Sequence, residues 1–186
     1  MSTVDDPPAP SEGWVLLRVL ACGLCGTDVE EYTAGPVLVP TSPHPLTGRC
    51  APLTLGHEFV GAVAAVGAGV TLTPGTTVAV DGNMWCGRCS WCLAGRQNLC
   101  PQLAQLGQQA DGGLADLVLA PAYSCVPYAG IEPTVAVFAE PLSVAVRAVA
   151  RGRVAPGDRV GVAGGGTIGL LTAQAARLAG AATVLV

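Results

Sequence analysis

Four cysteines share one short stretch, at the spacing C-x2-C-x2-C-x7-C: Cys86, Cys89, Cys92 and Cys100. Thiolates are soft charged ligands, and four of them on one loop can enclose a zinc ion tetrahedrally. Disulfides are disfavoured, because cysteines two residues apart bridge poorly. An iron–sulfur cluster is the alternative, since Pro101 follows the last cysteine, but ferredoxins space that last gap at three residues. We therefore predict a structural zinc site bound by these four cysteines.

A second chemical motif is a glycine-rich loop near the end of the chain. It lies between an apolar run that predicts a strand and an alanine-rich run that predicts a helix. Glycines there allow a tight turn, close approach of a pyrophosphate and close packing of helix on strand. The helix N-terminus adds free N–H groups that suit phosphate. The predicted dinucleotide-binding residues are Gly164, Gly165, Gly166, Thr167, Ile168 and Gly169.

The same segment leaves two alternatives open. Small residues at a helix–strand junction also occur without any ligand, and the acid expected about 20 residues after the first glycine is not found before Val186. Val160–Val186 is apolar enough to suggest a membrane span, but its glycines would break a spanning helix. Because a doubly wound fold needs more strands, we expect an incomplete nucleotide-binding domain and no membrane span.

Composition limits the classes of function. With 51% apolar and 12% charged residues among 186, the chain can bury a core. A net charge of −4 argues against a nucleic-acid partner. Eight cysteines with no evident secretory signal favour a reducing cytoplasm, where thiols serve as metal ligands.

The elements that would position these motifs fall into two regions. Short strands separated by glycine and proline, among them 14–21, 54–70, 77–80, 114–119 and 124–126, predict a barrel-like β domain over residues 1–133. A helix over 134–151, a strand over 159–163, a helix over 167–178 and a strand over 182–186 predict a β-α-β unit over residues 134–186. The expected fold class is therefore mixed β and α/β.

Several motifs in a fixed order carry a family resemblance. They are Cys22-Gly-Leu-Cys-Gly-Thr-Asp28, Gly56-His-Glu58, the four-cysteine loop, Ala139-Glu-Pro-Leu142 and the glycine-rich loop. The sequence resembles the zinc-dependent medium-chain alcohol and polyol dehydrogenases, most of all the 2,3-butanediol dehydrogenases, with sorbitol and threonine dehydrogenases as close neighbours. The resemblance implies a GroES-like β-barrel catalytic domain and the start of a Rossmann domain, truncated after its first β-α-β unit. It also implies a homodimer or homotetramer for the full-length parent.

The resemblance also implies a catalytic zinc site. Its metal ligands and catalytic residues would be Cys25, His57, Glu58 and Glu140, with Thr27 beside the cofactor ribose. Which of the two glutamates binds the metal directly is left open. A lone histidine is more often a core or surface residue, and a lone glutamate is more often solvated, so the order of the motifs decides this interpretation. Asp28 is expected to orient a ligand from behind.

The implied reaction is hydride transfer between a secondary alcohol or vicinal diol and a nicotinamide cofactor, NAD or NADP. Zinc would lower the pKa of the alcohol, and Thr27 would accept its proton. Two alternatives remain: a zinc-stabilised binding module without catalysis, and an inactive zinc-binding remnant of a dehydrogenase. A second, open metal site favours the enzyme, because a binding module has no use for one.

Overall fold

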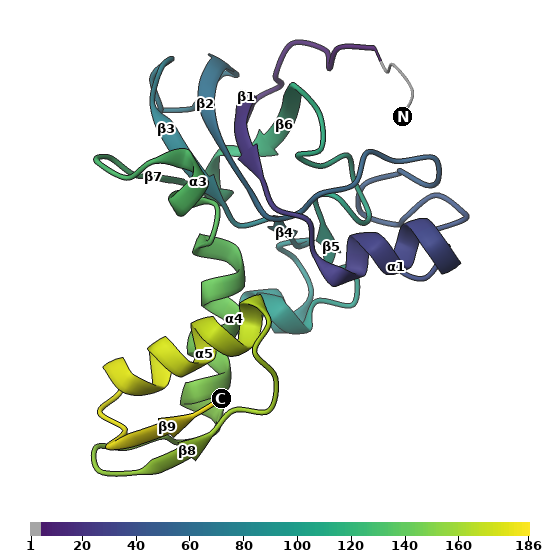
Figure 1. Ribbon diagram of the computed structural model, residues 1–186. Coiled ribbons are helices and arrows are strands. Elements are labelled where there is room, and N and C mark those ends of the chain that lie inside the picture. Colours follow the sequence, from purple (N-terminus) through teal and green to yellow (C-terminus); the bar gives the residue numbers. More distant parts are fainter. Residues whose placement is uncertain (1–4) are drawn as a thin grey trace. The chain divides into compact units, whose positions relative to one another are not determined.

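The computed structural model describes residues 5–186, so the first four residues of the predicted first domain lie outside it. The chain divides between Val137 and Phe138 into two compact units (Figure 1). This division lies close to the predicted boundary at 133/134. The assignment of each unit to an independent domain stays a prediction.

The first unit is built on a five-stranded antiparallel sheet with the strand order β6-β1-β2-β3-β7 (Figure 1). Its strands are β1 (Trp14–Cys22), β2 (Phe59–Val66), β3 (Thr77–Val80), β6 (Leu117–Pro121) and β7 (Cys125–Pro127). Along β1, Val15 and Leu17 are fully buried whereas Arg18 is exposed, which is the alternation of a sheet with one face on a core. Phe59, Val78 and other apolar residues of the neighbouring strands complete that core.

The expected closed β-barrel is not formed by the strands that the structure describes. Only three residues, the short 3-10 helix η2 (Ala122–Ser124), join β6 to β7, yet these two strands are the opposite edges of the sheet. The sheet must therefore curve, but no pairing between β6 and β7 closes it within residues 5–186. Pro121 and Pro127 end these edge strands, and each removes one N–H from its edge.

Other predicted elements of the first unit are partly right. The strand 77–80 is confirmed, and α1 (Gly26–Ala34) lies where a short helix is expected. The strand predicted from residue 54 begins only at Phe59, because the positive φ of Gly56, 95°, interrupts an extended backbone. The sequence does not predict four other short elements: β4 (Asn83–Met84), β5 (Ala104–Gln105), α2 (Ser90–Leu93) and the 3-10 helix η1 (Gln97–Leu99). The last helix of this unit is α3 (Pro133–Ala136).

The second unit is a small parallel α/β structure. It contains α4 (Ala139–Arg151), β8 (Arg159–Gly161), α5 (Thr167–Leu178) and β9 (Thr183–Leu185), and β8 pairs with β9 in parallel. Val149, Ala175 and Ala176 form its buried core. The helix predicted over 134–151 is divided into α3 and α4. Pro141 does not break α4, because it lies in the first turn, where its missing N–H would have no helical partner.

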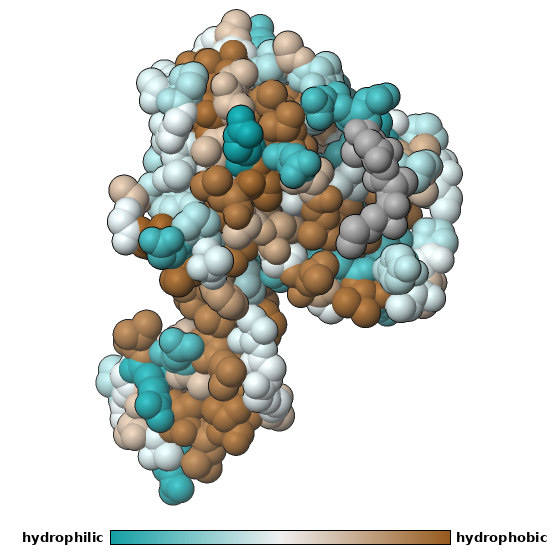
Figure 2. Space-filling view, turned by 45° about the horizontal axis from the view of Figure 1, so that its top comes forward, coloured by the Kyte–Doolittle hydropathy of each residue, from teal (hydrophilic) through white to brown (hydrophobic). Residues whose placement is uncertain are grey.

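Apolar side chains remain on the surface of the second unit. Large exposed ones are Val144, Val146, Leu170, Leu178 and Leu185, and Figure 2 shows apolar colouring over much of its visible face. Within residues 5–186, Pro133–Arg151 is the one helical stretch long and apolar enough to cross a membrane. This is weak evidence for a membrane span, because the stretch is divided into two helices, α3 and α4, and α4 carries charged residues.

Candidate functional site

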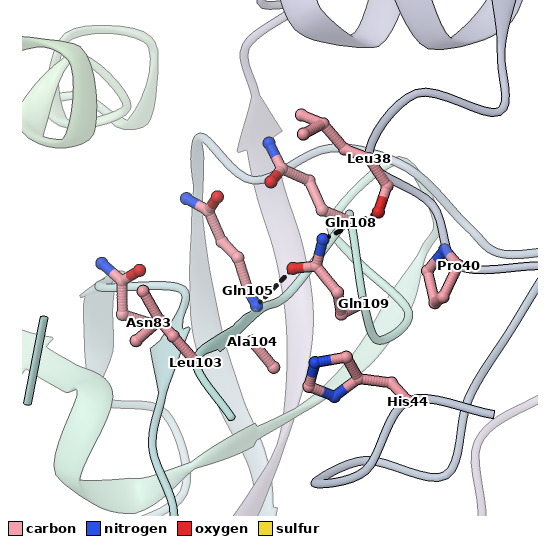
Figure 3. Close-up of a pocket in the computed structure, with 9 residues that line it drawn as sticks. All are labelled: Leu38, Pro40, His44, Asn83, Leu103, Ala104, Gln105, Gln108 and Gln109. Atoms are coloured by element: carbon pink, nitrogen blue, oxygen red, sulfur yellow. Dashed lines mark hydrogen bonds between the residues drawn. The ribbon is translucent and has the colours of Figure 1, made fainter. Parts of the chain in front are cut away.

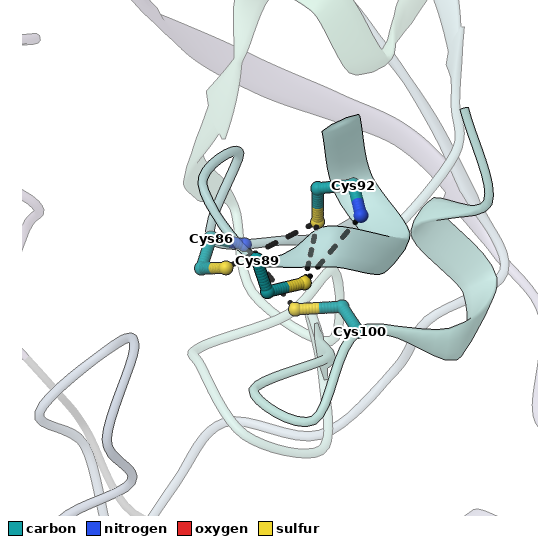
Figure 4. Close-up of side chains that lie close together, drawn as sticks. All are labelled: Cys86, Cys89, Cys92 and Cys100. Carbon is teal, nitrogen blue, oxygen red and sulfur yellow. Dashed lines mark hydrogen bonds between the residues drawn. The ribbon is translucent and has the colours of Figure 1, made fainter. Parts of the chain in front are cut away.

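The four predicted cysteine ligands lie together, with their Sγ atoms all within 4.8 Å of one another (Figure 4). Cys89 Sγ lies 3.4 Å from Cys92 Sγ, and Cys86 Sγ lies 4.0 Å from Cys92 Sγ. All eight cysteines of the chain are free thiols. The fourth sulfur belongs to Cys100, which follows η1 directly. A cluster of this kind has the donor set and spacing of a closed zinc site.

Local backbone geometry builds this cluster. Gly87 and Gly95 both adopt left-handed conformations, with φ of 70° and 71°, so the chain can turn back twice within the loop. The backbone N–H of Cys92 donates to Cys89 Sγ at 3.4 Å, and that of Gln102 donates to Cys100 Sγ at 3.3 Å. N–H groups aimed at sulfur stabilise thiolates, which are the form that binds metal.

The thiols of this cluster differ in acidity. Backbone N–H groups of Arg88 and Cys89 lower the pKa of Cys86 to about 6. Burial, together with the hydrogen bond to Cys89, raises the pKa of Cys92 to about 12. Hydrogen bonding and burial therefore act in opposite directions on the two thiols. A zinc ion fits here because it would compensate the negative charge of several thiolates at once.

A second group of ligand atoms lies apart from the first in sequence. Cys25, His57 and Glu58 each offer one atom, all within 4.8 Å of one another. Cys25 is the N-cap of α1, and the other two precede β2 directly. Gly23 packs against Glu58: its N–H donates to the Glu58 carbonyl at 2.7 Å, and a side chain in its place would collide with the carboxylate.

Asp28 connects the two segments that supply these ligands. Its side chain is 4% exposed, and its Oδ2 accepts a hydrogen bond from the Cys25 N–H at 2.9 Å. Its Oδ1 accepts from the Gly56 N–H at 3.3 Å and lies 3.5 Å from His57 Nδ1. The last distance is too long for a good hydrogen bond, so the two groups face each other without one. The carboxylate therefore holds α1 against the segment that carries the histidine.

Two buried polar atoms at this site have no hydrogen-bond partner in the described chain, Thr27 Oγ1 and His57 Nδ1. Buried polar atoms are normally paired, so unpaired ones indicate a missing partner or a functional role. The site thus combines a thiol, a buried imidazole, a carboxylate and an unpaired hydroxyl. This donor set, with fewer than four protein ligands, suits an open zinc site rather than a closed one.

Gly56 brings the histidine segment close to another part of the chain. Side chains at Gly107 or Gly112 would collide with the Gly56 carbonyl oxygen, and the Gly113 N–H donates to that oxygen at 2.8 Å. A side chain at Gly56 would lie 2.7 Å from the Cys22 sulfur. Segment 107–114 therefore runs directly along segment 54–57, an approach that only glycines permit.

In the second unit, the glycine-rich loop joins β8 to α5 as predicted. Gly164 has a φ of 115°, and a side chain at Gly169 would overlap the Gly164 carbonyl oxygen. Gly166 is the N-cap of α5, and a side chain there would meet no atom within 4 Å. The first and third glycines thus serve the turn and the close packing, and the middle one leaves open space before the helix N-terminus.

Comparison with known proteins places this geometry in a family. The family described as "Alcohol dehydrogenase GroES-like domain" matches residues 11–130. The chain belongs to this family. Among its curated relatives, a sorbitol dehydrogenase from Halalkalibacterium halodurans is 36% identical over 187 residues, which cover 96% of this chain and 50% of the relative.

Solved structures of similar proteins agree with the family. The 2R,3R-butanediol dehydrogenase of Bacillus subtilis matches with a TM-score of 0.89 and 34% identity, over 98% of this chain and 52% of that one. A short chain alcohol dehydrogenase from Escherichia coli CFT073, complexed with NADH, matches with a TM-score of 0.78 and 31% identity, over 97% of this chain and 57% of that one. The chain spans about half the length of the curated relatives it matches.

One residue predicted for the catalytic site, Glu140, is not part of the Cys25, His57 and Glu58 cluster. Glu140 lies in the first turn of α4, in the second unit, and its membership of the catalytic site stays a prediction. Cys22 received no role from the sequence, yet its sulfur lies beside the site. Burial, and the negative charges of Asp28 and Glu58, raise its pKa to about 12. Its C-x2-C spacing with Cys25 was the available signal for this proximity.

Proposed function

We propose that this chain supplies the catalytic zinc site of an oxidoreductase that transfers hydride between an alcohol and a nicotinamide cofactor. The observation that supports the proposal is the open cluster of Cys25, His57 and Glu58, held from behind by the buried carboxylate of Asp28. Binding modules stabilised by zinc need only the closed four-cysteine cluster. A second, open donor set with an unpaired hydroxyl beside it is the arrangement of a catalytic centre.

Each residue of the site has a distinct task in this proposal. Zinc held here would supply Lewis acidity, which lowers the pKa of an alcohol substrate. The contact between Asp28 and His57 Nδ1 leaves Nε2 as the ligand atom and favours the tautomer that a metal needs. Thr27 Oγ1 is buried and unpaired, so it can accept the proton of the alcohol and pass it onward. Glu58 contributes negative charge, and Glu140 is proposed as the second carboxylate.

The cofactor is proposed to be NAD, with NADP as the alternative. Gly164, Gly166 and Gly169 have the conformations and contacts that a pyrophosphate loop requires. The exposed apolar surface of the second unit supports its interpretation as the beginning of a Rossmann domain, because parallel sheets in such folds are covered on both faces. The predicted domains, 1–133 and 134–186, form part of this proposal, as does a homodimeric or homotetrameric parent in the cytoplasm.

The substrate is proposed to be a secondary alcohol or a vicinal diol of the 2,3-butanediol and acetoin type. The similar Bacillus subtilis structure supports this choice, whereas the curated sorbitol dehydrogenase supports a sorbitol-like polyol as the alternative. A vicinal diol suits a site with carboxylates near the metal ligands, because a second hydroxyl could donate to one of them.

The test uses the natural protein as its cell produces it. Elemental analysis should find two zinc ions per chain, and the protein should oxidise 2,3-butanediol with NAD, followed by the absorbance of the reduced cofactor. Cys25→Ser should remove one zinc and the activity together, whereas Cys50→Ser, a thiol outside both clusters, should change neither. Retention of full activity by Cys25→Ser would contradict the proposal. One zinc without turnover of any alcohol would favour the binding module, and two zincs without turnover would favour the inactive remnant.

A further inference from the structure

Charge is distributed unevenly between the two units. The first unit, Met1–Val137, contains four arginines and eleven acidic residues, a net charge of −7. The second unit, Phe138–Val186, contains five arginines and two acidic residues, a net charge of +3. The whole-chain value of −4 therefore conceals a small basic unit joined to a larger acidic one. Surfaces of opposite charge attract each other when two molecules meet.

Four arginines gather at the edge of the second unit where β8 and β9 begin. Arg159 is the first residue of β8. The Gly157 N–H donates to the Gly180 carbonyl at 2.9 Å, so the chain that enters β8 runs along the turn that leaves α5 (Figure 1). Val154 packs on the core that Val149 forms with α5, which places the end of α4 beside that helix. The arginines of this basic edge are Arg151, Arg153, Arg159 and Arg177.

The basic edge is exposed and carries little compensating charge. All four arginines are exposed, and none forms an ion pair among residues 5–186. The one acid in the edge, Asp158, accepts the Ala155 N–H at 2.8 Å. Leu178, next to Arg177, is 89% exposed. The edge therefore combines an excess of positive charge with an exposed apolar side chain.

Helix capping explains part of this charge. Arg151 and Arg177 lie in the last turns of their helices, where a cation stabilises the helix dipole. Arg153 and Arg159 lie outside both helices. Arg153 has a φ of 54°, a conformation that glycine adopts more readily, so the local backbone gives no reason for an arginine there. A partner with negative charge would give these two a role.

The segment before β1 has the complementary character. Residues 5–12 are Asp-Asp-Pro-Pro-Ala-Pro-Ser-Glu, with three acids and no base. Asp5, Asp6 and Glu12 are exposed, and residues 5–10 form no hydrogen bond with the rest of the described chain. Prolines keep such a segment extended, so it loses little conformational freedom when it binds. Its prolines can cover an exposed leucine while its acids meet arginines.

We propose that residues 5–12 of one copy of this chain bind to the basic edge of a second copy. Arginine suits this partner, because its planar guanidinium binds a carboxylate through two parallel hydrogen bonds. At about 3.1 Å per residue, the extended segment spans about 25 Å, enough to reach several of the four arginines. Exposed ion pairs are individually weak and are screened by salt, so the contact is reversible and weakens at high ionic strength. It needs neither zinc nor cofactor and is therefore independent of the proposed dehydrogenase activity.

Sedimentation velocity of the full chain tests the contact. The weight-average mass should rise with protein concentration at about 20 mM salt, and the dissociation constant should be at least about tenfold larger at about 500 mM salt. Reversing the edge with Arg153→Glu and Arg177→Glu should abolish this association, and so should reversing the segment with Asp5→Arg and Asp6→Arg. An equimolar mixture of the two double variants should restore it, because the reversed segment of one fits the reversed edge of the other. Arg18→Glu, at an exposed position on β1, is the control and should associate like the parent.

The mixture separates this contact from a loss of folding. If the mass of the parent protein does not depend on salt, or if either double variant associates like the parent, the proposal is wrong. It is also wrong if both variants stay apart when they are mixed. If reversal of the edge abolishes association but reversal of the segment does not, the edge binds another acidic surface and residues 5–12 are not its partner. An oligomer that is insensitive to salt and persists in every variant forms through a different interface and would overturn the proposal if no further association is seen.

Discussion

Replacing Asp28 by asparagine should weaken the metal site without touching any ligand atom. The carboxylate of Asp28 accepts from two backbone N–H groups, those of Cys25 and Gly56, and faces the imidazole of His57. Asparagine has the same shape but only one acceptor oxygen, so one buried N–H would face an NH2 group. Leaving that donor unpaired costs about 1–3 kcal/mol of folding free energy.

Metal affinity should fall by a similar free energy. Loss of an outer carboxylate behind a ligating histidine commonly costs about 10–100-fold in metal affinity, which corresponds to about 1.4–2.8 kcal/mol. Competition with a chromophoric chelator measures the two zinc ions separately, because the four-thiolate site holds its ion more tightly. Asp28→Asn should therefore weaken only the second zinc.

The control for this prediction lies on the same helix. Glu30→Gln removes the same charge from α1 at an exposed position, so it should leave both zinc affinities unchanged. If Asp28→Asn lowers the unfolding free energy yet binds the second zinc as tightly as the parent, Asp28 only supports the fold. The argument that it positions His57 would then be refuted.

Three further predictions concern other parts of the chain. Cys100→Ser should remove the structural zinc and lower the melting temperature by about 10 °C in calorimetry, because metal binding is coupled to folding. Burial raises the pKa of Cys125 to about 11 from the ordinary 9.0, so the folded chain holds this proton more tightly than the unfolded chain. About 3 kcal/mol of stability, complete below pH 9, should therefore disappear as the pH rises through 11, as urea titrations would show, and Cys125→Ala should abolish this loss. Gly166→Ala should fold normally, since its new methyl group meets no atom within 4 Å, but should weaken NADH binding at least tenfold by fluorescence titration; the same change at Gly161 should not.

The sequence was most informative where ligand spacing is local. The four cysteines lie within one loop, so their spacing alone predicted that their sulfurs would meet, and they do. The helix 167–178 and the strand 77–80 follow from periodicity and also agree with the structure. The strand predicted from residue 54 begins only at Phe59. Its first part could not be predicted correctly, because Gly56 packs against segment 107–114, which is distant in sequence.

The contact between Gln109 and Leu38 could not have been predicted from the sequence. Gln109 resembles any residue of a polar turn, and nothing indicates that it would bond to Leu38, 71 residues away (Figure 3). The pairing of the strands was missed for a related reason. The number of strands favours a barrel, but closure depends on a long-range pairing of β6 with β7, which is not formed among the described strands.

The packing at Gly56 explains why residues far from the metal ligands in sequence matter for their position. The Gly56 N–H is held by Asp28, and its carbonyl oxygen is held by the Gly113 N–H. One peptide segment therefore connects the helix that begins beside Cys25 to segment 107–114. A side chain at Gly107 would push that segment away from Gly56 and would disturb the position of the neighbouring His57. The structure thus requires small residues at these positions for a reason that the spacing of the metal ligands alone would not reveal.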